Sequence, residues 1–263
     1  MAIAPVLRIC TLLMALLLVG CVNNYEKFFE GRKIPANAIV LHQGEPEVFR
    51  GADYEADGLA LMSQGYVQLG YSSFNSADAS EANLVAQAKK IGAAKVLTYQ
   101  NYTNTVQGAV PLTLPNTQTT YHSGGVSAYG SGGSAYGSYS GTSTTYGTST
   151  TYIPYNRRRY DFHASYWVKA KPGIFGIHMR DLTPEERQSA GTNSGAYVIT
   201  PIKGTPAFDA DILRGDIILL VNSDKIHDFQ HLISLISKNR GETVSLTINR
   251  LGNEIVKEVT LNP

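Results

Sequence analysis

Cysteine is nearly absent from this chain, which has 263 residues and only two cysteines, Cys10 and Cys21. Small exported domains that cannot bury a sufficient core are usually rich in disulfides, so that class of scaffold is excluded. The folded units must be held together by burial and hydrogen bonding. Strong charge is lacking as well, because the formal net charge is +1. This balance does not favour nucleic-acid binding, and the one dense basic run, residues 157–159, is expected to be solvated.

The N-terminal segment, residues 1–20, is predicted to be a targeting signal. Its apolar run, residues 9–19, is shorter than the roughly 20 residues that a membrane-spanning helix needs. The run ends in Leu18-Val19-Gly20-Cys21, which resembles the lipobox of bacterial lipoprotein signal peptides. That resemblance implies that Cys21 receives diacylglycerol and becomes an acylated N-terminus after cleavage. Because Val22 stands where inner-membrane lipoproteins commonly carry Asp, an outer-membrane anchor is expected; an ordinary secretory peptide is the alternative.

The first folded region is predicted to be a small α/β domain over residues 36–171, preceded by a tether over residues 21–35. A helix over residues 53–64 and a second over residues 80–91 are indicated by their caps and by apolar residues at helical spacing. Short strands are expected over residues 38–41, 66–71, 95–102 and 160–171, with a turn over residues 72–76. We expect the strands at 95–102 and 160–171 to pair with each other.

Residues 106–156, between those two strands, are rich in Tyr, Gly, Ser and Thr. Beyond Leu114 their only large aliphatic residues are Val126 and Ile153. Such a composition predicts an inserted, disordered segment, because little apolar surface is available to offset chain entropy. The alternative is an adhesive arm, since recurring tyrosines can stack on glycans or on other proteins.

The C-terminal region carries a regular series of turns and short elements. A helix starts at Thr183, a second follows the turn at 203–207, and a third follows Asp228, with Phe229, Leu232, Leu235 and Ile236 on its apolar face. Strands are expected over residues 195–200, 217–221, 244–249 and 255–261. Together with the first domain, this order predicts an α+β fold in two domains.

Four motifs stand at the turns and strands of this region: Gly195-Ala196-Tyr197-Val198, Gly204-Thr205-Pro206-Ala207, Arg214-Gly215-Asp216-Ile217-Ile218 and Val221-Asn222. With them, residues 173–263 resemble the bacterial-type PDZ domain of high-temperature-requirement (HtrA) proteases, here without the protease domain. One departure is Asp211, which stands where that family usually has glycine; Asp tolerates left-handed backbone better than most residues. Residues 65–75 and 87–93 also resemble a domain of PDZ-bearing bacterial lipoproteins, for which no activity is implied.

The resemblance implies a peptide-binding groove. In that family a peptide adds as an extra strand, and its terminal carboxylate meets a loop that corresponds here to Ile174, Phe175, Gly176 and Ile177. Leu232 and Ile236, one helical turn apart, would line the apolar pocket for the terminal side chain. A groove that is closed or purely structural is the alternative, because a fold does not fix a function.

Catalytic and metal chemistry find little support in the sequence. Ser194 lies in a turn with no base and acid on a protease scaffold around it. His227 and His231 are four residues apart, but no Glu follows the first, and His227 is expected to precede the helix cap. The sequence therefore predicts a protein that is not an enzyme and that uses no cofactor or metal.

The sequence favours an envelope protein that is lipid-anchored at the outer membrane and binds peptide C-termini or extended segments of protein partners. Two alternatives stay open: a structural or adhesive lipoprotein that acts through its Tyr-rich arm, and a non-catalytic regulator of an envelope protease.

Overall fold

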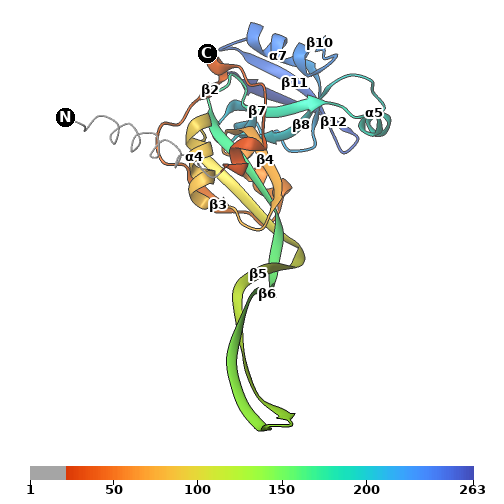
Figure 1. Cartoon of the computed structure of the whole chain (residues 1–263). Coiled ribbons are helices and arrows are strands. Elements are labelled where there is room, and N and C mark those ends of the chain that lie inside the picture. Colours follow the sequence, from red (N-terminus) through yellow and green to blue (C-terminus); the bar gives the residue numbers. More distant parts are fainter. Residues whose placement is uncertain (1–21) are drawn as a thin grey trace, which may run out of the picture. The chain divides into compact units, whose positions relative to one another are not determined.

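The computed structural model describes residues 22–263, so the expected signal peptide and Cys21 lie outside the described residues (Figure 1). The described chain forms two compact units. The first unit holds the residues up to Asn101 together with Tyr160–Pro263, and the second is Tyr102–Arg159. Within residues 22–263, no helix is long and apolar enough to cross a membrane. The fold is α+β, as the order of elements in the sequence predicts.

The first sheet is mixed. Its strands are β1 (Phe29–Gly31), β2 (Ile39–Val40), β3 (Glu47–Arg50), β4 (Tyr66–Ser76), β5 (Lys95–Gly130) and β6 (Gly133–Ala170). They follow the order β1-β4-β6-β5-β3, with β2 on the end of β6. β3 runs parallel to β5, whereas β4 is antiparallel to β6. The predicted pairing of residues 95–102 with 160–171 agrees with this order, because β5 and β6 are neighbours.

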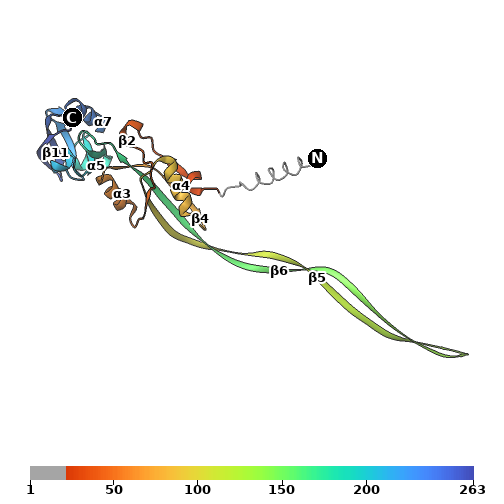
Figure 2. The ribbon, with the colours of Figure 1, turned by 90° about the vertical axis from the view of Figure 1, so that its left-hand side faces the viewer.

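Helices cover both faces of this sheet. They are α2 (Asn24–Lys27), α3 (Tyr54–Ser63) and α4 (Glu81–Ile91), together with the 3₁₀ turn η1 (Ala36–Ala38). Successive residues of a strand point to opposite faces, and on β6 the buried Tyr166 packs with Leu84 and Ala88 of α4, while Trp167 packs with Leu61 of α3. Figure 2 shows α3 and α4 with the strands between them. The result is a three-layered α/β domain.

Both predicted helices are confirmed, although the Ser80 side chain makes no cap hydrogen bond at the start of α4. The Asp53 side chain accepts the backbone N–H groups of Glu55 and Ala56 at the start of α3. Gly92 ends α4 in the left-handed region with φ 73°. Glycine takes this conformation without steric cost, because it has no Cβ.

The structure differs from the predicted tether over residues 21–35, because α2 and β1 lie there. The Tyr25 ring is buried and meets Phe74 edge to face, with ring centroids 4.9 Å apart. Asn23 caps α2, and β1 pairs with β4. The turn expected over residues 72–76 is likewise replaced by strand, since β4 continues to Ser76 beside β6. Both differences arise because aromatic burial and strand pairing with distant residues outweigh local polarity.

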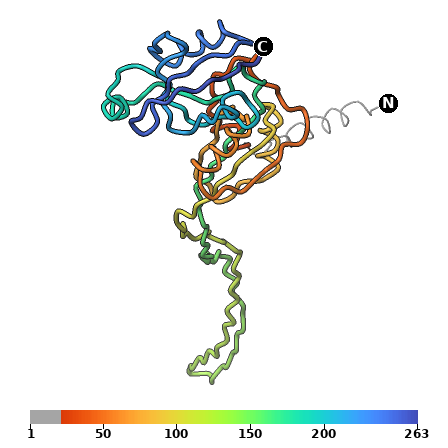
Figure 3. The backbone as a smooth tube through the Cα atoms, turned by 180° about the vertical axis from the view of Figure 1, so that it is seen from behind, coloured from red at the N-terminus to blue at the C-terminus, as the bar shows by residue number. Residues whose placement is uncertain are grey.

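The disorder expected over residues 106–156 is replaced by two paired strands. β5 and β6 continue through this segment and are joined by a turn at Ser131 and Gly132, as the backbone trace shows (Figure 3). Disorder was expected because the segment has few large aliphatic residues. Threonine and tyrosine favour strands, and a cross-strand ladder pairs the backbone groups even where no core is buried.

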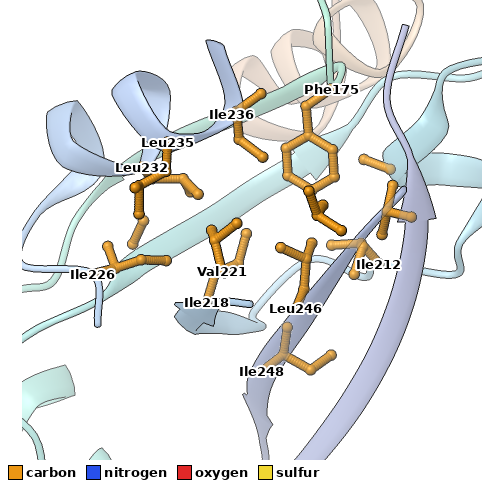
Figure 4. Close-up of a cluster of buried hydrophobic side chains, with 14 of the residues drawn as sticks. Phe175, Ile212, Ile218, Val221, Ile226, Leu232, Leu235, Ile236, Leu246 and Ile248 are labelled. Atoms are coloured by element: carbon orange, nitrogen blue, oxygen red, sulfur yellow. The ribbon is translucent and has the colours of Figure 1, made fainter. Parts of the chain in front are cut away.

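The second sheet belongs to the C-terminal domain. Its strands are β7 (Ile177–Asp181), β8 (Ala196–Pro201), β9 (Ile217–Val221), β10 (Asp224–Lys225), β11 (Thr243–Arg250) and β12 (Asn253–Thr260). The order is β12-β11-β9-β8-β7, with β10 on β9. The helices are α5 (Pro184–Ala190), α6 (Pro206–Asp209) and α7 (Phe229–Lys238). Apolar side chains from the sheet and from α7 meet in one core, part of which is drawn in Figure 4.

Asp211 takes the left-handed backbone conformation that its position requires, with φ 58°. Its side chain is exposed and forms an ion pair with Lys257, with Nζ 3.1 Å from Oδ2. The Lys257 ammonium holds the pKa of the Asp211 carboxyl below its usual range. Aspartate therefore adopts at this position the left-handed conformation that glycine takes most readily.

Candidate functional site

The loop before β7 turns its carbonyl groups into the domain. Each of its four carbonyl oxygens accepts a hydrogen bond, at 2.9–3.1 Å, from another segment: Asn262 Nδ2 to Gly173, Asn262 N to Ile174, Ala207 N to Phe175 and Ile202 N to Gly176. Because successive peptide units are fixed by these bonds, the loop is held by the body of the domain. Its conformation does not depend on a ligand.

The backbone N–H groups of the same loop have no such partners. Among the described residues, no acceptor receives the N–H group of Ile174, Phe175 or Gly176. Successive unpaired N–H groups in a turn form a concave site for an anion. A carboxylate can therefore be held by this loop, as in the capture of peptide termini by backbone N–H groups.

Gly176 is required by the shape of the loop. Its φ is 82°, and a Cβ at this position would lie 2.3 Å from the Cβ of Thr205. The Thr205 hydroxyl oxygen lies 3.0 Å from the Gly176 carbonyl oxygen and 2.6 Å from that of Ile202, so its one proton is shared between these two acceptors. Only glycine accepts both the positive φ and the close approach of this threonine.

β7, which follows the loop, is the last strand of its sheet. One edge pairs with β8, from Ile177 opposite Pro201 to Asp181 opposite Ala196. Helix α7 contacts β7, and the Phe229 N–H at its start donates to the Asp181 carboxylate at 3.0 Å. An edge strand beside a helix is the arrangement that accepts an added peptide strand.

The side of α7 that faces β7 carries an apolar stripe. The backbone N–H of Phe229 donates to Asp181, which places Phe229 near the end of β7. Ile236 belongs to the same buried cluster as Phe175, and the side chains of Phe175 and Ile236 both reach into that cluster in Figure 4. Ile233 stands four residues after Phe229 and three before Ile236, and therefore shares their face. It is 41% exposed, so it is the member of the stripe with most surface left for a ligand.

The six residues expected to bind a peptide differ in burial. Ile174 and Ile177 are half-buried against the core, whereas Phe175 is 4% exposed and can meet a ligand only through its N–H group. Ile236 is 5% exposed, and Leu232 has no exposed surface. Sequence reasoning missed Ile233, although its spacing from Phe229 and Ile236 was a signal that could have identified it.

Charges gather at the far end of β7. The guanidinium of Arg180 donates to both carboxylate oxygens of Glu186, each at 2.6 Å, and stacks over the Tyr197 ring at 4.1 Å. These hydrogen bonds lower the pKa of Glu186 to about 2. Glu186 also closes the capping box of α5 by accepting the Thr183 N–H. The Arg180 guanidinium is thus already paired with Glu186. The N–H groups of the loop before β7 are therefore the donors that we assign to an anion.

The residues considered for catalysis or metal binding do not form a constellation. The Ser194 hydroxyl lies 3.4 Å from that of Thr192. The rings of His227 and His231 stack at 4.9 Å, and His227 precedes the Asp228 cap of α7. Within residues 22–263, no group of three or more His, Cys, Asp or Glu side chains could hold a metal ion.

The fold and the loop define a PDZ domain, and the family model described as PDZ domain matches residues 173–261. This domain is homologous to the PDZ domains of DegP-like and HtrA proteases. A probable periplasmic serine endoprotease, DegP-like, of Bartonella henselae is 38% identical over 85 residues, which cover 31% of this chain and 17% of that protein. A protein of the same name from Chlamydia muridarum is 29% identical over 102 residues, which cover 36% of this chain and 20% of that protein.

Solved structures of the same group are also similar. The HtrA3 PDZ domain bound to a phage-derived ligand is 25% identical, with 34% of this chain and 83% of that chain covered and a TM-score of 0.31. The HtrA-type protease AlgW with a decapeptide is 24% identical, with 34% and 28% covered and a TM-score of 0.31. The chain spans about a fifth or less of the length of the two curated relatives.

Proposed function

We propose that this protein binds the C-terminus or an extended segment of a partner protein between the open edge of β7 and helix α7. The observation that carries the proposal is the arrangement of the loop before β7, whose carbonyl groups are bonded inward while the N–H groups of Ile174, Phe175 and Gly176 have no acceptor among the described residues. A peptide carboxylate would accept these N–H groups, and the peptide backbone would pair with the open edge of β7.

The stripe on α7 favours an apolar side chain at the peptide terminus. Ile236 and Ile233 would contact that side chain, with Leu232 beneath them. Leu232 is fully buried, so a ligand would reach it only if its neighbours moved. Each buried methylene of the ligand would contribute about 0.8 kcal/mol, so the terminal residue would account for much of the selectivity.

The proposed setting is the bacterial cell envelope. Both curated relatives are named as periplasmic, and the lipobox-like sequence before Cys21 supports a lipid anchor, with the outer membrane favoured by Val22. The protein would act there by binding. Its PDZ match is to an interaction module, and the serine and histidine residues considered above are not arranged for catalysis.

The test is fluorescence anisotropy of the full chain with a library of peptides that end in apolar residues. Binding should fall when the peptide carboxylate is replaced by an amide, because the loop would lose the charge that its N–H groups hold. Ile233→Glu should weaken binding by about tenfold or more, equivalent to about 1.4 kcal/mol.

Ser234→Glu is the matched control for that variant. It adds the same charge at the neighbouring exposed position, about 100° around the helix, and should leave affinity within about twofold. Equal binding of acid and amide peptides, with no effect of Ile233→Glu, would refute the proposed groove.

A further inference from the structure

The distal hairpin of β5 and β6, residues 104–158, has a regular register. The hydroxyls of Thr113 and Thr150 lie 2.8 Å apart, and those of Thr119 and Thr144 lie 3.5 Å apart. From the first pair to the second, one strand advances by six residues and the other goes back by six. The register of the two strands is therefore constant between these points. Tyrosine rings also lie over glycines of the opposite strand, Tyr139 over Gly124 and Tyr155 over Gly108.

Both outer edges of this hairpin are open. β3 pairs with β5 only as far as Thr98, and β4 pairs with β6 only from Tyr160. Among the described residues no third strand lies beside residues 104–158. Every second residue of each strand therefore directs its N–H and C=O groups outward. An isolated two-stranded hairpin is only marginally stable in water, so such an edge gains stability from another strand.

Between Asn116 and Ile153 the sequence carries neither charge nor proline, the usual protection against edge pairing. From Val96 to Asn156 there is no Asp, Glu, Lys or Arg, and from Asn116 to Ile153 there is no proline. Proteins commonly keep exposed edges apart with lysine or other charges, proline or bulges. Here the edges are neutral over residues 116–130, roughly 50 Å at about 3.3 Å per residue.

We propose that residues 116–153 pair, edge to edge, with the same segment of a second copy of this chain. Like charges would oppose the alignment of two identical edges, and these edges have no charge. The contacts between the two copies would be of the kinds already present within the hairpin, threonine opposite threonine and tyrosine over glycine. A charged partner would find no counter-charge on this edge, so the chemistry of the segment favours its own copy.

The test is sedimentation of the full chain in a density-matched detergent over a range of concentrations. The native protein should self-associate reversibly. Ser138→Lys/Thr142→Lys places two charges on β6, at positions that form no side-chain hydrogen bond among the described residues. Its apparent dissociation constant should rise by about tenfold or more. The matched neutral variant Ser138→Gln/Thr142→Gln should change it by less than about threefold.

Amide exchange, resolved residue by residue, separates loss of association from loss of the hairpin. In the native protein, outward N–H groups of residues 116–153 should exchange more slowly as concentration rises, while inward N–H groups are protected throughout. The lysine variant should lose only the concentration-dependent part. A native protein that stays monomeric with concentration-independent exchange would overturn the proposal. So would a monomer that binds a peptidoglycan oligosaccharide, because stacking of exposed tyrosines on glycans would then explain the segment.

Discussion

Replacement of Arg250 by alanine should destabilise the PDZ domain more than replacement of its partner Asp216 by asparagine. Asp216 is 1% exposed, and its two carboxylate oxygens each accept a hydrogen bond from Arg250 at 2.8 Å. Without Arg250, the buried carboxylate keeps only the Leu213 N–H at 2.8 Å. Arg250 also donates to the Asp211 carbonyl, which it holds in its left-handed conformation. Arg250→Ala thus removes two hydrogen bonds to a buried carboxylate and one to the carbonyl of the left-handed turn at Asp211.

The expected magnitude follows from this asymmetry. Removing one partner of a buried ion pair costs about 3–5 kcal/mol, because the other charge stays buried without compensation. With a urea dependence of about 1.5 kcal/mol per molar for a domain of this size, the unfolding midpoint should fall by about 2–3 M. Asp216→Asn should lower the free energy of unfolding by less, about 1–3 kcal/mol. In that variant Arg250 is partly exposed to solvent and still donates to the Asp211 carbonyl.

The assay uses the single tryptophan as a second, separate probe of unfolding. Trp167 lies in β6 of the α/β domain, so its fluorescence follows that domain, whereas circular dichroism of the full chain follows both. Arg250→Ala should shift the dichroism transition to lower urea, and the Trp167 transition shows whether the α/β domain, which lies in the same compact unit, unfolds with the PDZ domain. The double variant Asp216→Asn/Arg250→Ala should cost less than the sum of the single changes. An Arg250→Ala midpoint within about 0.3 M of the native one would refute the reasoning.

The remaining predictions concern α5 and the left-handed turn. The pKa of Glu186 is lowered to about 2 in the folded protein, so its stabilising contribution is complete above its unfolded pKa and is lost as pH falls towards 2. The protection factors of the α5 amides, which correct for the intrinsic pH dependence of exchange, should fall over that range, and Glu186→Gln should remove this loss. Asp211→Val should destabilise the domain by about 1–2 kcal/mol, because a β-branched residue strains φ 58°. Asp211→Gly should stay within about 1 kcal/mol, since relief of backbone strain offsets the exposed ion pair with Lys257; equal losses in thermal melts of both variants would contradict this account.

Where the sequence succeeded, the signal was local. The caps at Asp53 and Thr183, the glycine stop at Gly92 and the spacing of apolar residues each act over a few residues, so the helices could be predicted from them. The turn motifs around Asp216 likewise identified the PDZ domain and the loop before β7. The sequence also predicted that β5 and β6 would be neighbours, because a strand was expected on each side of the insertion.

Other features were decided by contacts between distant residues. Residues 21–35 were expected to be a tether, but burial of Tyr25 against Phe74 packs this segment onto the first sheet. The long hairpin depends on pairing between residues such as Thr113 and Thr150, which local composition does not reveal. The apolar periodicity of α7 was visible in the sequence, but tertiary packing buried Leu232 completely and left Ile233 partly exposed.

The sequence by itself determined the α+β class, most of the helix ends and the glycine at 176, because these follow from local backbone and side-chain chemistry. Only the tertiary structure decided that the carbonyls of the 173–176 loop are bonded inward, that β7 is an edge strand and that the distal hairpin has two open edges. Each of these depends on which distant segment supplies or withholds a hydrogen-bond partner, and such partners are set by packing across the whole domain.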